Sequence, residues 1–129
     1  MPVTLRRRLD ELRHPLLRLH RVLLDDERAA YERAHGRISA GELLQLLLSH
    51  PQFSWLRAIS ELVVQIDEML ESKEAGAAAS ADDLLKAARS LLLSATSESE
   101  FAKKYHDALQ RLPDAVLAHR ETTVILSNA

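Results

Sequence analysis

The stretch Ser39–Leu70, SAGELLQLLLSHPQFSWLRAISELVVQIDEML, decides the fold of this chain. Ser39 followed three residues later by Glu42 fits a capping box, in which each side chain accepts a hydrogen bond from the backbone N–H of the other residue. A leucine-rich helix is therefore expected to begin directly after Ser39. It should end near His50, because Pro51 disfavours helical geometry at the residue before it.

A second helix is predicted after the proline corner, at about 55–72. Its apolar residues recur every three or four positions on one stripe, and a second apolar stripe lies beside the first. Since so wide an apolar face needs cover from more than one neighbour, we expect this helix at the centre of a helical bundle. The two stripes comprise Trp55, Ile59, Leu62, Ile66 and Met69, and Leu56, Val63 and Leu70.

Composition extends the helical prediction to the whole chain. The 129 residues, 47% of them hydrophobic, suffice for one contiguous core, and only 3 glycines and 4 prolines interrupt them. We therefore expect a single all-α domain over residues 1–129, an up-and-down bundle of five or six helices. The lack of cysteine excludes disulfides and thiolate metal sites and agrees with a cytoplasmic setting. No apolar run has the length needed to span a bilayer.

The N-terminal third predicts a long helix or a kinked pair of helices. Leucines recur at helical spacing up to residue 23, and Gly36 is a plausible C-terminal cap. Pro15 lacks the N–H that would bond the carbonyl of Glu11, so a kink or break is expected near His14.

The second half of the chain predicts further helices and one linker. The segment at about 73–81 has no large apolar residue and is interpreted as a flexible linker. Ser80 with Asp83 suggests one helix start, and Ser97 with Glu100 fits a second capping box. A short helix is expected around residues 115–119. The conformation of the tail at about 120–129 is left open, because residues 122–126 are largely β-branched.

Two Glu-x-x-His patterns are the sharpest candidates for chemistry. Glu11 with His14, and Glu32 with His35, place a carboxylate and an imidazole on one helix face, as in carboxylate-bridged metal sites. The two pairs are separated by 21 residues, so on one straight helix they would be about 30 Å apart and could not share a metal pair within one chain. Polar helix ends are the simpler interpretation, and no cofactor is expected.

The basic N-terminus suggests a contact with phosphate. Residues 1–21 carry six arginines against two acids, and Arg6, Arg7 and Arg8 are consecutive. Nucleic-acid binding by a whole domain usually shows a strongly basic footprint, and the pI of about 6.3 argues against it here. The favoured interpretation is that these arginines pair with acids of a neighbouring helix or subunit; residues 61–83 carry seven acids against one lysine.

The number and placement of the apolar residues favour a protein-protein interaction. The chain has no Gly-x-Ser-x-Gly elbow and no glycine-rich phosphate loop, so an enzyme without cofactor ranks last among the functions considered. Tandem leucines, such as Leu43 with Leu44, widen the apolar stripes beyond what a small bundle needs to hide. We therefore expect a non-enzymatic interaction or structural module, a homodimer or the binder of another protein. The alternatives are a metal- or small-ligand-binding bundle and a nucleic-acid accessory protein that uses the basic N-terminal helix.

Two segments also carry a resemblance. HRVLLDDERAAYERAHG (His20–Gly36) and ISAGELLQLLLSHPQFSWLRAISELVVQIDEML (Ile38–Leu70) resemble a group of small all-helical bacterial proteins without an assigned function. The resemblance covers under half of the chain. It implies a bacterial, cytoplasmic setting and nothing about catalytic residues.

Overall fold

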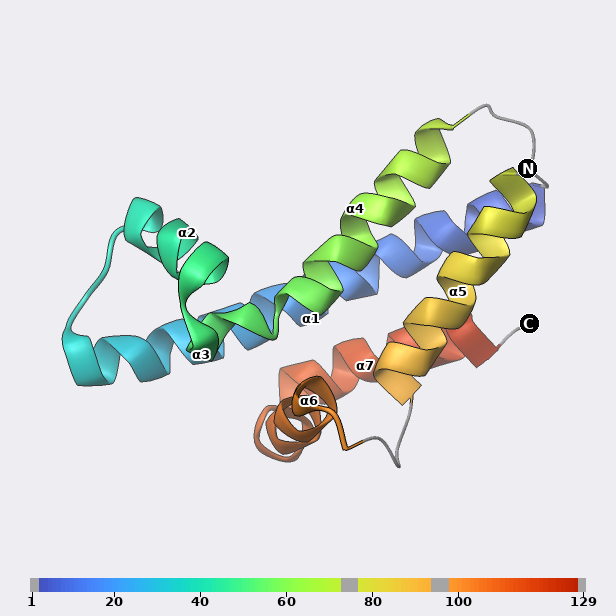
Figure 1. Ribbon diagram of the computed structural model, residues 1–129. Coiled ribbons are helices and arrows are strands. Elements are labelled where there is room, and N and C mark those ends of the chain that lie inside the picture. The colour runs from blue at the N-terminus through green and yellow to red at the C-terminus, as the bar shows by residue number, and fades with distance from the viewer. Residues whose placement is uncertain (1–2, 73–76, 94–97, 128–129) are drawn as a thin grey trace.

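The computed structural model of the chain describes residues 3–72, 77–93 and 98–127. These ranges contain seven helices and no strand, which confirms the all-α prediction and exceeds the expected number of five or six helices (Figure 1). The helices are α1 (Val3–His35), α2 (Ala40–Ser49), α3 (Pro51–Ser54), α4 (Arg57–Glu71), α5 (Ala77–Leu93), α6 (Glu100–Arg111) and α7 (Pro113–Ser127).

The sequence predicted a kink or a break near His14. Helix α1 runs through Pro15 without a break. Pro15 is buried beside Leu12 and Leu16 in the apolar stripe of the helix, so packing opposes the break that the ring favours. The carbonyl of Glu11, which loses its helical partner, belongs to an exposed residue. Gly36 ends the helix with a φ of 85°, and its N–H donates to the carbonyl of Glu32 at 2.8 Å, as the sequence predicted.

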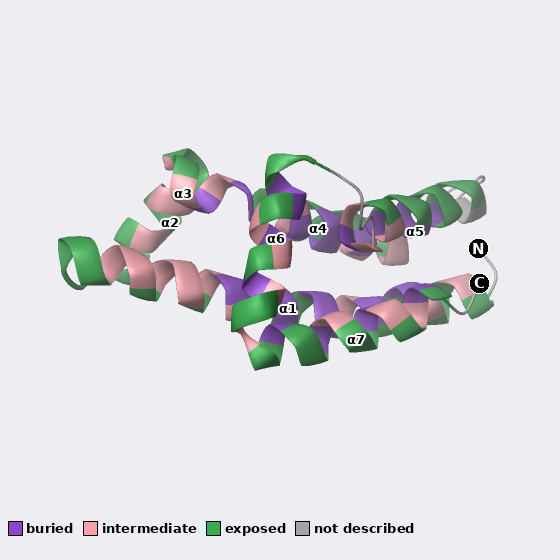
Figure 2. Cartoon of the chain, turned by 90° about the horizontal axis from the view of Figure 1, so that it is seen from below, coloured by how far each residue is buried: buried purple, intermediate pink, exposed green. Residues whose placement is uncertain are grey.

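Two layers of helices enclose the main core. Figure 2 shows α1 and α7 side by side in one layer and α4 and α5 in the other, while α6 lies across them. The buried leucine stripe of α1 faces Ile59 and Ile66 of α4, Leu85 and Leu92 of α5, and Leu126 of α7 within one cluster. Removing these side chains from water is the principal favourable contribution to folding.

The helix with the most neighbours is α1, whereas the sequence placed the helix at about 55–72 in the centre. Helix α1 packs against α3, α4, α5 and α7, and α4 packs mainly against α1 and α5. The apolar stripes of α4 are buried at Ile59, Leu62, Val63 and Ile66, as predicted. Its remaining face is exposed, so α4 covers one side of α1 and is not itself surrounded.

The C-terminal part of α1 extends beyond the other long helices and carries α2 and α3 (Figure 1). We call residues 25–35 of α1 together with α2 and α3 the arm. Phe53 of α3 is fully buried and forms ring contacts with Tyr31 and His50. Arg28 donates to the carbonyl of Ile38 at 2.9 Å. Aromatic and polar contacts thus help to hold the arm, and Leu47 of α2 packs against the main core.

Helix starts in the second half differ from the sequence prediction. Residues 77–81, expected in the linker, form the beginning of α5, and the rest of that segment, 73–76, lies outside the described residues. Ser80 and Asp83 therefore lie inside a helix. Ser99, and not Ser97, caps α6 and accepts from the N–H of Ala102 at 3.1 Å; Ser97 lies outside the described residues.

The tail that the sequence left open is helical to residue 127, and residues 128–129 lie outside the described part. Thr122 and Thr123 each donate a side-chain hydroxyl to the carbonyl one turn earlier, both at 2.9 Å. These bonds satisfy the hydroxyls inside the helix, and Thr122 is fully buried. The β-branched run therefore continues α7 instead of forming a strand.

Candidate interaction surface

Helix α2 carries five leucines, none of which is buried. Its start agrees with the predicted capping box in part: the Ser39 hydroxyl accepts from the N–H of Glu42 at 3.1 Å and lies 3.2 Å from the Glu42 carboxylate. The helix packs mainly against α3 and stands off α1. A cleft of about 560 Å³, lined in part by Leu17, Leu24 and Leu43, separates it from α1.

The outer side of α2 is the most exposed apolar part of this helix. Leu44 and Leu48 lie one turn apart and are 55% and 59% exposed. Leu48 also lines a groove of about 420 Å³ between the end of α2 and the outer face of α4. Val64 of α4, 54% exposed, lies in the same groove. Three large apolar side chains thus face solvent on two neighbouring helices.

Charged side chains surround Val64 along α4. Arg57, Glu61, Val64 and Glu68 follow each other at intervals of four, three and four residues, which places them on one exposed stripe of the helix. Arg57 also donates to the carbonyl of Leu48 at 3.0 Å and thereby ties the end of α2 to the start of α4. We call Leu44, Leu48 and these four residues of α4 the α2–α4 face.

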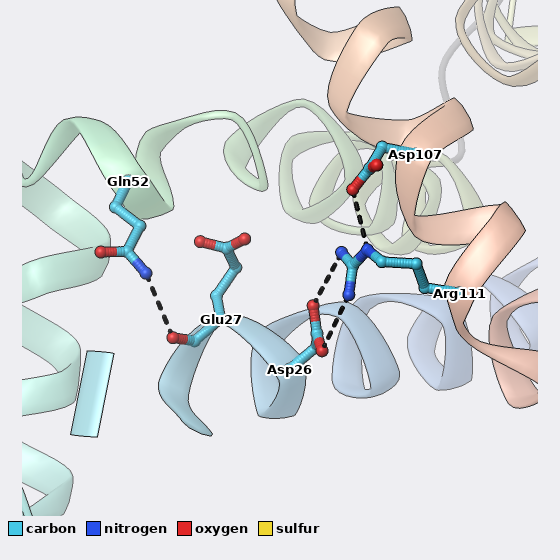
Figure 3. Close-up of polar contacts among 5 residues, drawn as sticks. All are labelled: Asp26, Glu27, Gln52, Asp107 and Arg111. Carbon is cyan, nitrogen blue, oxygen red and sulfur yellow. Dashed lines mark hydrogen bonds and ion pairs between the residues drawn. The ribbon is translucent and has the colours of Figure 1, made fainter. Parts of the chain in front are cut away.

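A polar junction fixes α6 to the C-terminal part of α1. Figure 3 shows Arg111 between two carboxylates: its Nε donates to Asp107 at 2.8 Å, and its Nη2 and Nη1 donate to Asp26 at 3.2 and 3.4 Å. These bonds raise the pKa of Arg111, so the guanidinium stays charged. Nearby, the Gln52 amide donates to the backbone carbonyl of Glu27 at 3.3 Å and connects α3 to α1.

A small cavity of about 240 Å³ lies beside this junction. Burial raises the pKa of Glu27, which lines it together with Trp55. The indole Nε1 of Trp55 is buried and has no hydrogen-bond partner within the described part of the chain. Both cations and carboxylates line the cavity, so no single ligand charge is favoured. The other lining residues are Lys103, Lys104, Asp107 and Arg111.

A partly buried polar contact joins α6 to α7. The Tyr105 hydroxyl lies 2.6 Å from Nδ1 of His119, and Phe101 stacks on the Tyr105 ring. Burial raises the pKa of Tyr105, and burial, aided by the nearby His106, lowers the pKa of His119. The neutral forms of both side chains are therefore favoured, which suits a structural hydrogen bond between a hydroxyl donor and a ring-nitrogen acceptor.

The two Glu-x-x-His pairs remain apart in the structure. Glu11 and His14 are exposed on the first half of α1. Glu32 accepts from the backbone N–H of Ile38 and lies 3.7 Å from Arg28, while His35 packs against the ring of Tyr31. Because α1 is continuous, the pairs are about 30 Å apart. No group of three or more metal-ligating side chains occurs in the ranges the structure describes.

The N-terminal arginines contact α4 through one member. Arg6 donates to the carbonyl of Leu70 at 2.6 Å, and Arg6 and Arg7 line a shallow groove together with Leu70. Arg8 is half-buried. Further along α1, Arg13 and Asp67 form an ion pair at 2.5 Å, so the basic segment does meet the acidic one at that point, as the favoured interpretation expected.

Sequence reasoning found the surplus of leucines but not the α4 stripe. The apolar stripes of α4 drew attention to its buried side, and the pattern Arg57, Glu61, Val64 and Glu68 was not singled out. Its spacing of four, three and four residues is the signal that could have identified it, because that spacing keeps one line of side chains on one face.

The chain matches no protein-family model, no curated protein and no solved structure. None of the helices in the described ranges is both long enough and apolar enough to cross a membrane.

Proposed function

We propose that this chain is a non-enzymatic helical interaction module that associates with a second copy of itself through the α2–α4 face. One observation carries the proposal: α2 is rich in leucine, yet none of its leucines is buried. Burying apolar area contributes roughly 25 cal/mol per Å². A partner that covers Leu44, Leu48 and Val64 would therefore recover free energy that folding of the single chain leaves unused.

The charges of the face favour a second copy as the partner. Arg57 lies at one end of the α4 stripe and Glu68 at the other, so the face carries both signs and is complementary to itself. Two-fold dimers are the commonest oligomers, and their interface consists of the same patch on both subunits. A strongly basic or acidic partner would instead meet a like charge at one end of the stripe.

The experiment is sedimentation velocity over a range of protein concentrations from about 1 to 100 μM. We expect wild-type protein to shift from monomer to dimer, and we expect the double variant Leu44→Gln/Leu48→Gln to remain monomeric over this range. The matched control is Leu117→Gln, because Leu117 is 60% exposed but lies on α7, away from this face. Circular dichroism of each variant verifies that it is folded.

A wild-type protein that stays monomeric throughout would refute self-association. A dimer that Leu117→Gln weakens as much as the α2 double variant does would refute the location of the interface. The metal and nucleic-acid alternatives gain no comparable support, because Glu11 and His14 have no third ligand among the described residues and Arg6 is engaged with α4. We also propose that the protein acts in the cytoplasm.

A further inference from the structure

The groove on α4 is arranged symmetrically about its own midpoint. Its α4 residues are Arg57, Ser60, Glu61, Val64, Gln65 and Glu68. Along the sequence, Arg57 and Glu68 lie equally far from the point midway between Glu61 and Val64, one on each side. Ser60 and Gln65 also lie equally far from this point, but closer to it. A second copy of α4 laid antiparallel across this point therefore matches the groove residue by residue.

We infer that two copies pair through antiparallel α4 helices, with the two-fold axis passing between Glu61 and Val64. This inference rests on the proposed self-association and specifies its register. Arg57 then lies opposite Glu68 of the second copy, and Ser60 lies opposite Gln65 of the second copy. Each contact occurs twice because of the symmetry.

The charged groups of the stripe are available for these contacts, whereas the Ser60 hydroxyl already donates to the carbonyl of Arg57 at 3.2 Å and can only accept. None of the ion pairs in the described ranges involves Arg57, Glu61 or Glu68. Arg57 uses one nitrogen for the carbonyl of Leu48 and retains further N–H donors of its planar guanidinium for a carboxylate. Charge pairs of this kind set the register and orientation of an interface more than its total affinity.

The apolar residues lie where this arrangement buries them. Two packed helices are about 8–10 Å apart, a distance at which side chains on facing stripes interdigitate. Val64 lies close to the axis and meets the aliphatic part of Glu61 of the second copy, whose carboxylate extends to the rim. Leu48 forms the neighbouring wall of the same groove, so each copy of α2 flanks the α4 helix of the other.

The register is tested by reversing the charges at its two ends. In Arg57→Glu, the new glutamate of each copy faces Glu68 of the other; in Glu68→Arg, the new arginine of each copy faces Arg57 of the other. We expect each single variant to weaken the dimer at least about tenfold. An equimolar mixture of the two variants restores both pairs and should form a heterodimer with near wild-type affinity, and the double variant R57E/E68R should again form a homodimer. Sedimentation velocity measures all four samples.

Two controls separate the register from other effects. Arg120→Glu makes the same charge change at an exposed position of α7 and should leave the dimer unchanged. Glu68→Arg preserves the bond from Arg57 to Leu48, so its effect cannot arise from loosening of α2. Dimer formation should also weaken as salt rises, because the pairs are exposed to solvent.

The outcomes distinguish this inference from the proposal beneath it. If wild type is monomeric at every concentration, self-association fails and the register fails with it. If wild type dimerises but the single charge reversals have no effect, or the mixture does not recover the affinity, the register is wrong while self-association stands. Recovery in the mixture and in the double variant, with loss in each single variant, supports the antiparallel α4 pair.

Discussion

The sharpest consequence of the fold is that leucine-to-alanine changes in α2 should cost far less than comparable changes in α4. Ile59 is fully buried, whereas Leu48 is 59% exposed, although Leu48 lies in the more apolar of the two helices. A measured difference between Ile59→Ala and Leu48→Ala therefore tests whether the arm lies outside the main core.

The two magnitudes follow from burial. Ile59→Ala removes buried methyl and methylene groups and leaves a cavity, a change that costs about 2–5 kcal/mol. Leu48→Ala removes three carbons worth about 0.8 kcal/mol each when fully buried, and only about two-fifths of the side chain is covered. Solvent fills the gap, and alanine is the better helix former, so the net loss should be about 1 kcal/mol or less.

Urea unfolding followed by far-UV circular dichroism measures both free energies, at concentrations where sedimentation shows single copies. Fluorescence of Trp55, the sole tryptophan of the chain, provides a second probe at the corner between α3 and α4. Equal losses for the two variants in the monomeric state would show that α2 belongs to the core, and the reasoning behind the α2–α4 face would then be refuted.

Three further predictions concern the polar contacts. Ser39→Ala removes the N-cap bond of α2, which is worth about 1 kcal/mol, and should increase amide hydrogen exchange in α2 more than in α4. Arg111→Gln breaks the link from α6 to Asp26 and should lower the free energy of unfolding by about 1 kcal/mol or less, since the pair is largely exposed; urea titration measures it. His119 has a lowered pKa in the folded state, so the unfolded state binds more protons: stability is complete above about pH 6.5 and decreases as the pH falls below it. His119→Asn retains an acceptor for Tyr105 without titrating, and thermal unfolding at pH 7.5 and 5.5 should show a smaller loss than wild type. Because burial also lowers the pKa of His20, the pH dependence should shrink without vanishing.

The parts of the fold that the sequence predicted are those governed by neighbouring residues. The capping serine of α2, the proline corner and the glycine at the end of α1 act within one turn of the chain, and each appears in the structure as expected. The apolar stripe of α4 is likewise a local periodicity, and its residues are buried. Local chemistry was therefore sufficient to place these elements.

The departures arise where packing between distant segments overrides a local preference. Pro15 favours a break, but it lies in the buried stripe of α1, and packing against neighbours far along the chain keeps the helix continuous through it. Residues 77–81 looked like a linker because they are small. Ala81 is fully buried in the core cluster, and the helical propensity of alanine adds to that packing. Neither outcome can be read from a window of a few residues.

The α2–α4 face was likewise predicted in part by local sequence, while the rest depends on packing between distant segments. Tandem leucines indicated that some apolar side chains would remain uncovered, and Leu44 is one of them. The identity of the uncovered leucines depends on how far α1 extends beyond α5 and α7. That extension is a property of the assembled helices and not of any single segment. The role of the α4 stripe depends in addition on a groove that only the approach of α2 to α4 creates.

The construction of the arm explains why a partner would act there and not on the main core. Phe53 and the polar bonds at Arg28 and Gln52 fix α3 and the turn before α2, but none of the leucines of α2 is buried. A helix of 10 residues has little stability by itself, so α2 depends on the packing of its apolar face. Binding that covers this face stabilises the folded arm by mass action. In the proposed dimer, association would cover the exposed leucines, and the charges of α4 would determine which surface can cover them.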